Sequence, residues 1–362
     1  MLSEKAIPKY TGSMQHFAGL KHYRFIGGLA DDVEAIDVRT GAGFNFTVLP
    51  GRGMDIAYAY YNDIPISYSS KTGIVGAPYY EYEGMNWIRS FFGGLVTTCG
   101  LSNVGPPCIE EHETIGTIRH GLHGRISNIP ADHLCLKEGW ENGAYHMVIS
   151  GSCHEGCLHA ESRTLVREIS AEYGAAKLEI NDRIRNDAPC QDEIMLLYHI
   201  NIGYPIVNET TRFIASVRES NPIGVLAGKE RYDIFASPVP EYSERCYLLD
   251  LNTDHDGFVH FGIVNDSIGI GFALSYNKAA LPYFNLWKML KEGEYVVGLE
   301  PCTCPPIGRI QAKQENRLET LLSCETKTTN MIFTILCSKR EIADFEKKVR
   351  SLHDEKGRQN EL

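Results

Sequence analysis

The sequence lacks a long hydrophobic run, because no segment approaches the roughly 20 uninterrupted apolar residues that span a bilayer. Residues 1–17 also lack the apolar core of a secretory signal. Positive charge is scarce too: 35 Lys and Arg face 46 Asp and Glu, which leaves a formal net charge of −11. That balance disfavours nucleic acid and anionic membranes as partners. We therefore expect a cytoplasmic protein with neither kind of partner.

Several catalytic and metal-binding signatures are missing. The chain has no Walker A loop, no GxGxxG opening a helix, no HExxH and no GxSxG. Cys302 and Cys304 are separated by one residue, and no second close cysteine pair accompanies them at the spacing of a zinc site. The only other cluster of Cys and His residues in the sequence lies at 153–159. We predict no metal and no cofactor. The 11 cysteines form an odd number without an export signal, which favours reduced thiols over disulfides.

Short runs rich in Val, Ile, Tyr, Phe and Thr lie between scattered glycines and prolines and indicate β-strands. Residues 177–184 alternate in polarity after a turn pattern at 172–175, which predicts a hairpin with one buried face. No Gly/Ser linker or charge block marks a boundary, so we expect a single domain over 1–362. Further strands are expected at 145–150, 258–264, 268–276 and 330–337.

Helical periodicity is clear only near the C-terminus. Ser338 and Glu341 have the spacing of a capping box, and apolar residues then recur on one face at Ile342, Phe345, Val349 and Leu352. Gly357 is expected to end the helix. The pattern predicts a helix over residues 338–355, packed outside an all-β core.

Four segments place polar side chains among glycines and apolar residues, which is typical of a pocket wall: 51–56, 87–103 with 120–125, 195–205 and 295–306. Arg52 and Asp55 in the first segment are candidates for a binding site. Alternatively, they form a local ion pair at the tip of a hairpin. His120 and His123 are flanked by glycine and so do not lie on a stable helix face. A metal site that includes them would need a loop that brings them together and a third ligand from elsewhere.

Two residues on predicted strands are candidates for acid/base chemistry. Glu300 follows an apolar run, and a buried carboxylate needs a partner or a raised pKa, so it is either a tuned acid or base or half of a structural salt bridge. His199 lies in another apolar run and is either a catalytic group or a hydrogen-bonded core residue.

The order of these segments resembles the galactose mutarotase-like superfamily, the aldose 1-epimerases, over residues 26–337. Leu122-His123-Gly124-Arg125 is similar to the family's Leu-His-Gly-Gly loop, with Arg in place of the second Gly. Residues 197–203 resemble the segment that supplies a second histidine, and Leu299-Glu300-Pro301 matches the strand end that carries the catalytic glutamate. The resemblance implies that His123, His199 and Glu300 are catalytic.

The same resemblance implies a substrate-binding set. Arg52 looks like the family's sugar-binding Arg, and Asp55 accompanies it. The family's substrate-binding Asp has no clear match, so Glu244 or Asp254 takes its place, with Glu244 preferred. The chain also has its own polar residues: Trp87, Arg89, Arg125, Trp287 and Lys288.

The fold implied by the family is a large antiparallel β-sandwich, and the implied reaction is interconversion of sugar anomers. Ring opening needs a base at the anomeric hydroxyl, here Glu300, and an acid at the ring oxygen, here His199, with His123 orienting the proton. Other isomerisation, epimerisation or elimination on a sugar or sugar acid, or noncatalytic carbohydrate binding, remain alternatives. Arg52, Arg89, Arg125 and Lys288 near one site would favour an acidic sugar, or Asp55, Glu244 and Glu300 offset these cations around a neutral sugar. The sequence leaves open whether the protein forms a homodimer.

Overall fold

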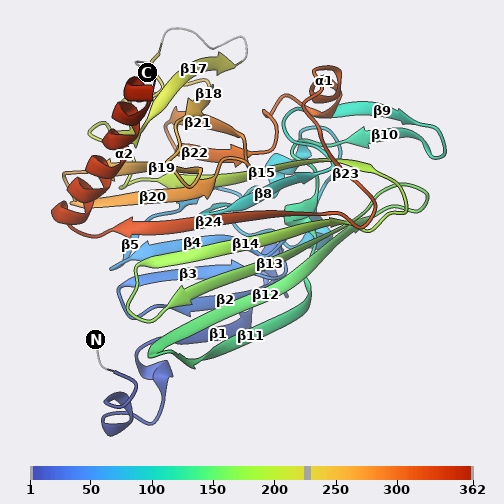
Figure 1. The fold of residues 1–362 in the computed structure, drawn as a ribbon. Helices are drawn as coiled ribbons and strands as arrows, with labels where there is room; N and C mark the ends of the chain where they lie inside the picture. Colours follow the sequence, from blue (N-terminus) through green and yellow to red (C-terminus); the bar gives the residue numbers. More distant parts are fainter. Residues whose placement is uncertain (1–2, 224–229, 360–362) are drawn as a thin grey trace.

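The computed structural model describes residues 3–223 and 230–359. One large sheet is antiparallel and has eight strands in the order β11-β12-β13-β14-β24-β20-β19-β16 (Figure 1). The bounds are β11 Asp132–Glu141, β12 Ala144–Gly156, β13 Ser162–Glu172, β14 Lys177–Asn186, β16 Arg212–Ala215, β19 Phe258–Asn265, β20 Ile270–Asn277 and β24 Thr326–Leu336. The expected hairpin is confirmed, since β13 and β14 pair on either side of residues 173–176.

A second antiparallel sheet has the order β17-β18-β21-β22-β15-β23, and β8 also pairs with β15. Its strands are β8 Thr97–Leu101, β15 Asp192–Gly203, β17 Val217–Ile223, β18 Arg245–Leu251, β21 Tyr283–Lys291, β22 Glu294–Cys302 and β23 Glu319–Leu321. Residues Ile194–Gly203 of β15 are all buried, so this strand is covered on both faces.

The N-terminal part forms a five-stranded sheet in chain order, with β1 Gly19–Arg24, β2 Glu34–Arg39, β3 Phe44–Leu49, β4 Asp55–Tyr61 and β5 Ile64–Pro65. Two strand pairs complete the β structure: β6 Tyr68–Ser69 with β7 Gly93–Gly94, and β9 Cys108–His112 with β10 Gly116–His120. Short 3-10 helices are η1 Ile7–Lys9, η2 Met14–His16, η3 Gly28–Ala30, η4 Ala77–Tyr79, η5 Asn86–Arg89 and η6 Ile126–Asn128.

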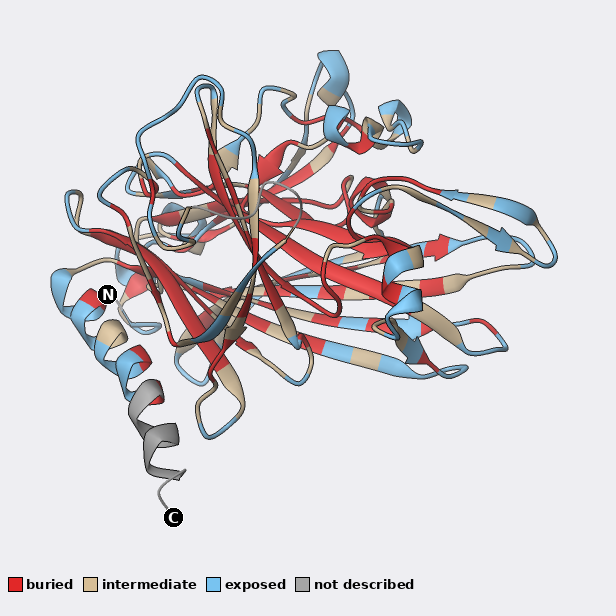
Figure 2. Ribbon diagram, turned by 90° about the horizontal axis from the view of Figure 1, so that it is seen from above, coloured by how far each residue is buried: buried red, intermediate tan, exposed pale blue. Residues whose placement is uncertain are grey.

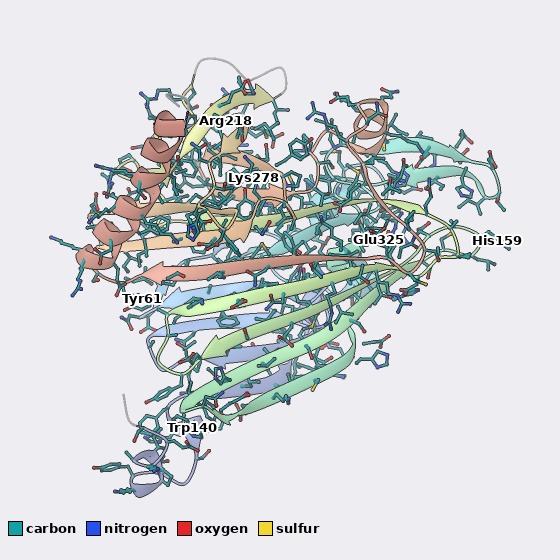
Figure 3. All side chains as sticks on the ribbon, viewed as in Figure 1. Tyr61, Trp140, His159, Arg218, Lys278 and Glu325 are labelled. Carbon is teal, nitrogen blue, oxygen red and sulfur yellow. The ribbon has the colours of Figure 1, made fainter. Side chains whose placement is uncertain are left out.

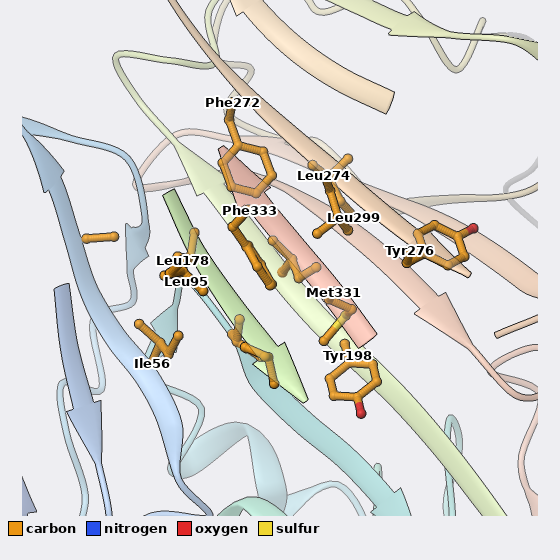
Figure 4. Close-up of a cluster of buried hydrophobic side chains, with 14 of the residues drawn as sticks. Ile56, Leu95, Leu178, Tyr198, Phe272, Leu274, Tyr276, Leu299, Met331 and Phe333 are labelled. Atoms are coloured by element: carbon orange, nitrogen blue, oxygen red, sulfur yellow. The ribbon is translucent and has the colours of Figure 1, made fainter. Parts of the chain in front are cut away.

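The main hydrophobic core lies between the two large sheets, and buried residues fill the centre of the molecule (Figure 2). Tyr198 and Leu299 from the seven-stranded sheet belong to the same cluster as Phe272, Met331 and Phe333 from the eight-stranded sheet (Figure 4). Alternation along each strand sends one set of side chains into this core. The all-β sandwich is therefore confirmed.

The predicted C-terminal helix is present as α2, Lys339–Gln359. The Ser338 hydroxyl accepts from Glu341 N at 3.2 Å, and the Glu341 carboxylate accepts from Cys337 N at 2.6 Å. The helix packs on β16, β19 and β20, and Gly262 matters here because a Cβ would lie 2.8 Å from the Phe345 ring. One expectation was wrong: α2 continues through Gly357.

The remaining helix is α1, Arg309–Gln314. Within the described ranges no helix has the length and apolar character needed to cross a membrane. One core cluster draws residues from Ala18 to Ile335. The single-domain assignment over 1–362 stays a prediction.

Candidate active site

The site is built on the central strands of the seven-stranded sheet. Along β15 the side chains of His199 and Asn201 point to one face, while Tyr198 and Ile200, on either side of His199, pack in the core. On β22 the same alternation places Glu300 on the site face, beside His199 of the neighbouring strand. Strand alternation therefore separates the polar site face from the apolar core face.

His199 and Glu300 form a buried acid/base pair, with His199 Nε2 3.2 Å from Glu300 Oε1. His199 Nδ1 lies 2.6 Å from Asn201 Oδ1. The Asn201 amide nitrogen donates to the Gly93 and His199 carbonyls at 3.0 and 2.9 Å, so its oxygen is the group left to accept. Neutral His199 therefore carries its proton on Nδ1, and the Nε2 lone pair faces the carboxyl group.

Burial sets the protonation of this pair. It raises the pKa of Glu300 to about 8, although the hydrogen bond from Asn285 Nδ2 to Glu300 Oε2, at 2.6 Å, works in the opposite direction. Burial also lowers the pKa of His199 to about 4, partly offset by Asn201. Near neutral pH the pair therefore holds one ionisable proton, and burial favours it on Glu300. The oxygen that faces His199 is Oε1, because Oε2 is bonded to Asn285.

His123 comes from the loop that follows β10 and lies beside His199, with ring centroids 5.9 Å apart. Gly105 N donates to its Nδ1 at 3.3 Å, so neutral His123 carries its proton on Nε2. Burial, with His199 nearby, lowers its pKa to about 3. The next residue, Gly124, has φ +67, and a Cβ there would lie 2.3 Å from the Gly100 carbonyl oxygen. The loop thus requires this glycine.

Aromatic rings surround the two histidines. Trp87 on η5 stacks on Phe91 with centroids 4.8 Å apart, and it lies 4.8 Å from the His123 ring. Phe91 and Trp287 lie 5.1 and 5.2 Å from His199. Trp287 Nε1 donates to Glu244 Oε2 at 2.9 Å, which places Glu244 at the edge of this cluster. Trp87 is 3% exposed and belongs to a core cluster, whereas Phe91 and Trp287 are partly exposed. The flat faces of these two rings beside polar groups suit a ring-shaped ligand with hydroxyl groups.

Arg52 and Asp55 are used inside the fold. Arg52 is 1% exposed, and its guanidinium donates to the carbonyls of Ser127 at 2.8 Å, Ser90 at 3.1 Å and Val75. Asp55 accepts from Thr98 and from Arg167 NH1, at 2.6 and 3.1 Å. Neither side chain bonds to the His199–Glu300 pair. Arg52 therefore fixes the backbone around η5, and the local hairpin-tip pair with Asp55 is not formed.

The three other basic candidates do not converge on the pair either. Lys288 alternates with Trp287 along β21, and its ammonium group bonds to Glu230 and to the Ile234 carbonyl at 2.5 Å. The Arg89 side chain is 69% exposed, and the Arg125 guanidinium lies 4.0 Å from the centre of the Tyr82 ring. Arg52 and Lys288 are therefore bonded inside the fold, and the preference for an acidic sugar stays a prediction.

Sequence reasoning missed Asn201, Asn285 and Phe91. A signal was available for both asparagines, because Asn201 lies two residues after His199 and Asn285 two residues before Trp287, on the same strand faces. No group of three or more Cys, His, Asp or Glu in the described part of the chain could hold a metal ion.

The fold is similar to that of solved galactose mutarotase-like structures. A candidate aldose 1-epimerase from Klebsiella pneumoniae has TM-score 0.84 and 20% identity, covering 92% of this chain and 87% of that one. A galactose mutarotase-like protein from Clostridium acetobutylicum has TM-score 0.59 and 13% identity over 88% and 99%. The galactose 1-epimerase from Lactobacillus acidophilus has TM-score 0.56 and 11% identity over 88% and 98%.

These identities show a shared fold. At the level of sequence family, the chain belongs to the family described as "Domain of unknown function (DUF4432)", which matches residues 30–335. No curated protein matches the chain.

Proposed function

We propose that this protein is an aldose 1-epimerase-type enzyme that interconverts the anomers of a sugar. The observation that carries the proposal is the buried pair of His199 Nε2 and Glu300 Oε1 at 3.2 Å. The two groups hold one shared proton near neutral pH, because burial moves their pKa values in opposite directions, to about 4 and about 8. Ring opening needs one group that takes a proton and one that gives a proton.

In the proposed mechanism the shared proton first moves from Glu300 to His199 Nε2. The resulting carboxylate takes the proton of the anomeric hydroxyl, and the imidazolium gives its proton to the ring oxygen as the C1–O5 bond breaks. Rotation about C1–C2 in the open aldehyde then exposes the other face, and the reverse transfers close the ring. His123 Nε2–H is the neighbouring donor that orients the ring oxygen.

The aromatic rings support this assignment by giving the sugar a place to lie. Trp87 and Phe91 form a stacked pair on one side of the histidines, and Trp287 meets His199 edge-on. The mechanism draws only on side chains. Each positioned proton transfer contributes roughly 10²- to 10⁴-fold, which suits a reaction that already proceeds slowly in water.

The test is a screen of anomerically pure sugars for accelerated mutarotation, measured by polarimetry or NMR line exchange. Wild-type protein is compared with Glu300→Gln, and a sugar on which wild type acts and the variant does not supports the proposal. Conversion at another carbon or loss of water, seen by NMR on the same samples, would instead favour an epimerase, isomerase or lyase. Failure of wild-type protein on every aldose would contradict the assignment.

A further inference from the structure

A cavity lies away from the His199–Glu300 pair. It has a volume of about 220 Å³ and is lined by residues from β9, β10, α1 and the turns before β13 and β15. His159, Cys190 and Gln191 are exposed at its mouth, and Figure 3 shows His159 at the far end of the long strands. Neither His123, His199 nor Glu300 belongs to its lining.

The charged groups of this cavity neutralise one another. Arg163 bonds to Asp192 through two contacts, Nε to Oδ2 at 2.5 Å and NH2 to Oδ1 at 2.8 Å. Arg309 Nε and His120 Nε2 lie 2.9 and 3.1 Å from Glu110 Oε2. His120, Arg309 and Lys313 together hold the pKa of Glu110 well below its usual range, so this carboxylate is ionised. Each cation is thus already bonded to a carboxylate, which disfavours an anionic ligand.

Two residues of the lining have buried polar atoms without a hydrogen-bond partner among the described residues, Ser102 Oγ and His120 Nδ1. Such atoms are rare in folded proteins because an unmade buried hydrogen bond is costly. Arg163 NH1 instead faces the buried Glu155 carboxylate at 3.8 Å. The Ser102 hydroxyl can donate, and because neutral His120 donates from Nε2 to Glu110, its Nδ1 is an acceptor. The cavity therefore offers a donor and an acceptor, while its charged groups are paired.

We propose that this cavity is a second binding site, for a neutral polyhydroxylated molecule of monosaccharide size or smaller. Hydroxyl groups both donate and accept, which matches the donor on Ser102 and the acceptor on His120. The volume of about 220 Å³ lies below the roughly 300–1,000 Å³ of pockets for drug-sized ligands, so one small ring is the upper limit. The inference does not depend on the reaction proposed above.

The test uses myo-inositol, which is neutral, carries hydroxyl groups and has no anomeric carbon. Full-length protein labelled with ¹⁵N-histidine is titrated, and the imidazole signals of His120, His123 and His199 are assigned by their loss in single variants. The expected result is a shift of the His120 signals with those of His123 and His199 unchanged. Binding at this site and binding at the proposed active site are thereby distinguished.

Matched variants complete the test by calorimetry. His120→Gln keeps a donor for Glu110 but lacks the Nδ1 acceptor, so myo-inositol should bind roughly five- to tenfold more weakly. Ser102→Ala should weaken binding similarly. The control is His260→Gln, because both ring nitrogens of buried His260 already have partners, Asp254 at 2.7 Å and Ser275 at 2.6 Å. The His260→Gln variant should bind myo-inositol with the same affinity as wild type.

Three results would overturn the proposal. No response to myo-inositol at millimolar concentration would mean that the cavity holds water only. A shift of the His120 signals with inorganic phosphate but not with myo-inositol would mean an anion site. Shifts confined to His123 and His199 would mean that the molecule binds only at the proposed active site.

Discussion

Asn285 and Glu300 stand directly opposite each other on β21 and β22, and Asn285 Nδ2 lies 2.6 Å from Glu300 Oε2. The bond holds one oxygen of the carboxyl group and leaves Oε1 facing His199. The carboxyl group thus has one oxygen held by Asn285 and one that faces His199, and the second is the oxygen that would act in the proposed mechanism.

Glu300→Gln should lower turnover by roughly 10²- to 10⁴-fold, because the amide keeps the size and loses the proton transfer. His199→Asn should lower it almost as much. The control is Glu155→Gln, since Glu155 is also buried and burial also raises its pKa, yet it lies outside the pair. A near wild-type rate for Glu300→Gln on a sugar that the parent protein converts would refute the mechanism.

The same variant should affect stability in a pH-dependent way. The pKa of Glu300 rises from 4.5 to about 8 on folding, so folded protein holds this proton more tightly than the unfolded chain. The stabilisation is complete below about pH 4.5 and is lost as the pH rises toward about 8. The melting temperature of Glu300→Gln, relative to wild type, should therefore be highest above pH 8. If the melting temperatures of Glu300→Gln and wild type differ by the same amount at pH 5 and pH 9, the raised pKa of Glu300 is contradicted.

The pH profile of kcat/KM should be bell-shaped. The reactive pair holds one proton between the pKa values of about 4 and about 8, so activity should rise through the first and fall above the second. Asn285→Ala removes the hydrogen bond that favours the ionised Glu300 carboxylate, so the pKa of Glu300 should rise further. The alkaline limb of the profile of this variant should therefore move to higher pH. A rate that keeps rising above pH 8 would show that Glu300 acts alone as a base.

Gly298 is expected to be essential for activity. A Cβ at this position would lie 2.5 Å from Glu300 Oε1 and 3.1 Å from the His199 ring, so Gly298→Ala should displace the pair and sharply reduce turnover. Gly139→Ala on β11 is the matched control, because a Cβ there meets nothing within 4 Å. Polarimetry and thermal melts on both variants check this, and full activity of Gly298→Ala would disprove the geometry.

Arg52→Lys should lower the melting temperature without a selective rise in KM. Lysine cannot reproduce the planar set of donors that Arg52 directs at the carbonyls of Ser127, Ser90 and Val75. A large rise in KM with an unchanged melting temperature would restore Arg52 to the sugar-binding set.

The sequence was informative wherever local patterns decide structure. Alternation predicted the hairpin at 172–175, and the capping box predicted where α2 begins. His123, His199 and Glu300 were selected from short motifs, and the structure brings them together. These features depend on residues close in sequence or on fixed motif spacing.

The basic candidates were harder to interpret because their partners are distant in sequence. Arg52 bonds to Ser127, 75 residues away, and Lys288 bonds to the Ile234 carbonyl, 54 residues away. Only the closed fold shows that these cations are satisfied internally. The continuation of α2 through Gly357 was missed for a different reason: glycine lowers helix stability by only about 1 kcal/mol, which neighbouring turns can offset.

The division of the site between strands and loops has a consequence for motion. His199 and Glu300 lie on β15 and β22, which have hydrogen-bonded neighbours on both sides, so their amides should exchange with solvent only on near-global opening. His123 and Trp87 lie in a loop and on a 3-10 turn, where local opening costs less. In the proposed reaction the sugar would therefore enter on the side of His123 and Trp87, while the strands that carry His199 and Glu300 keep their positions.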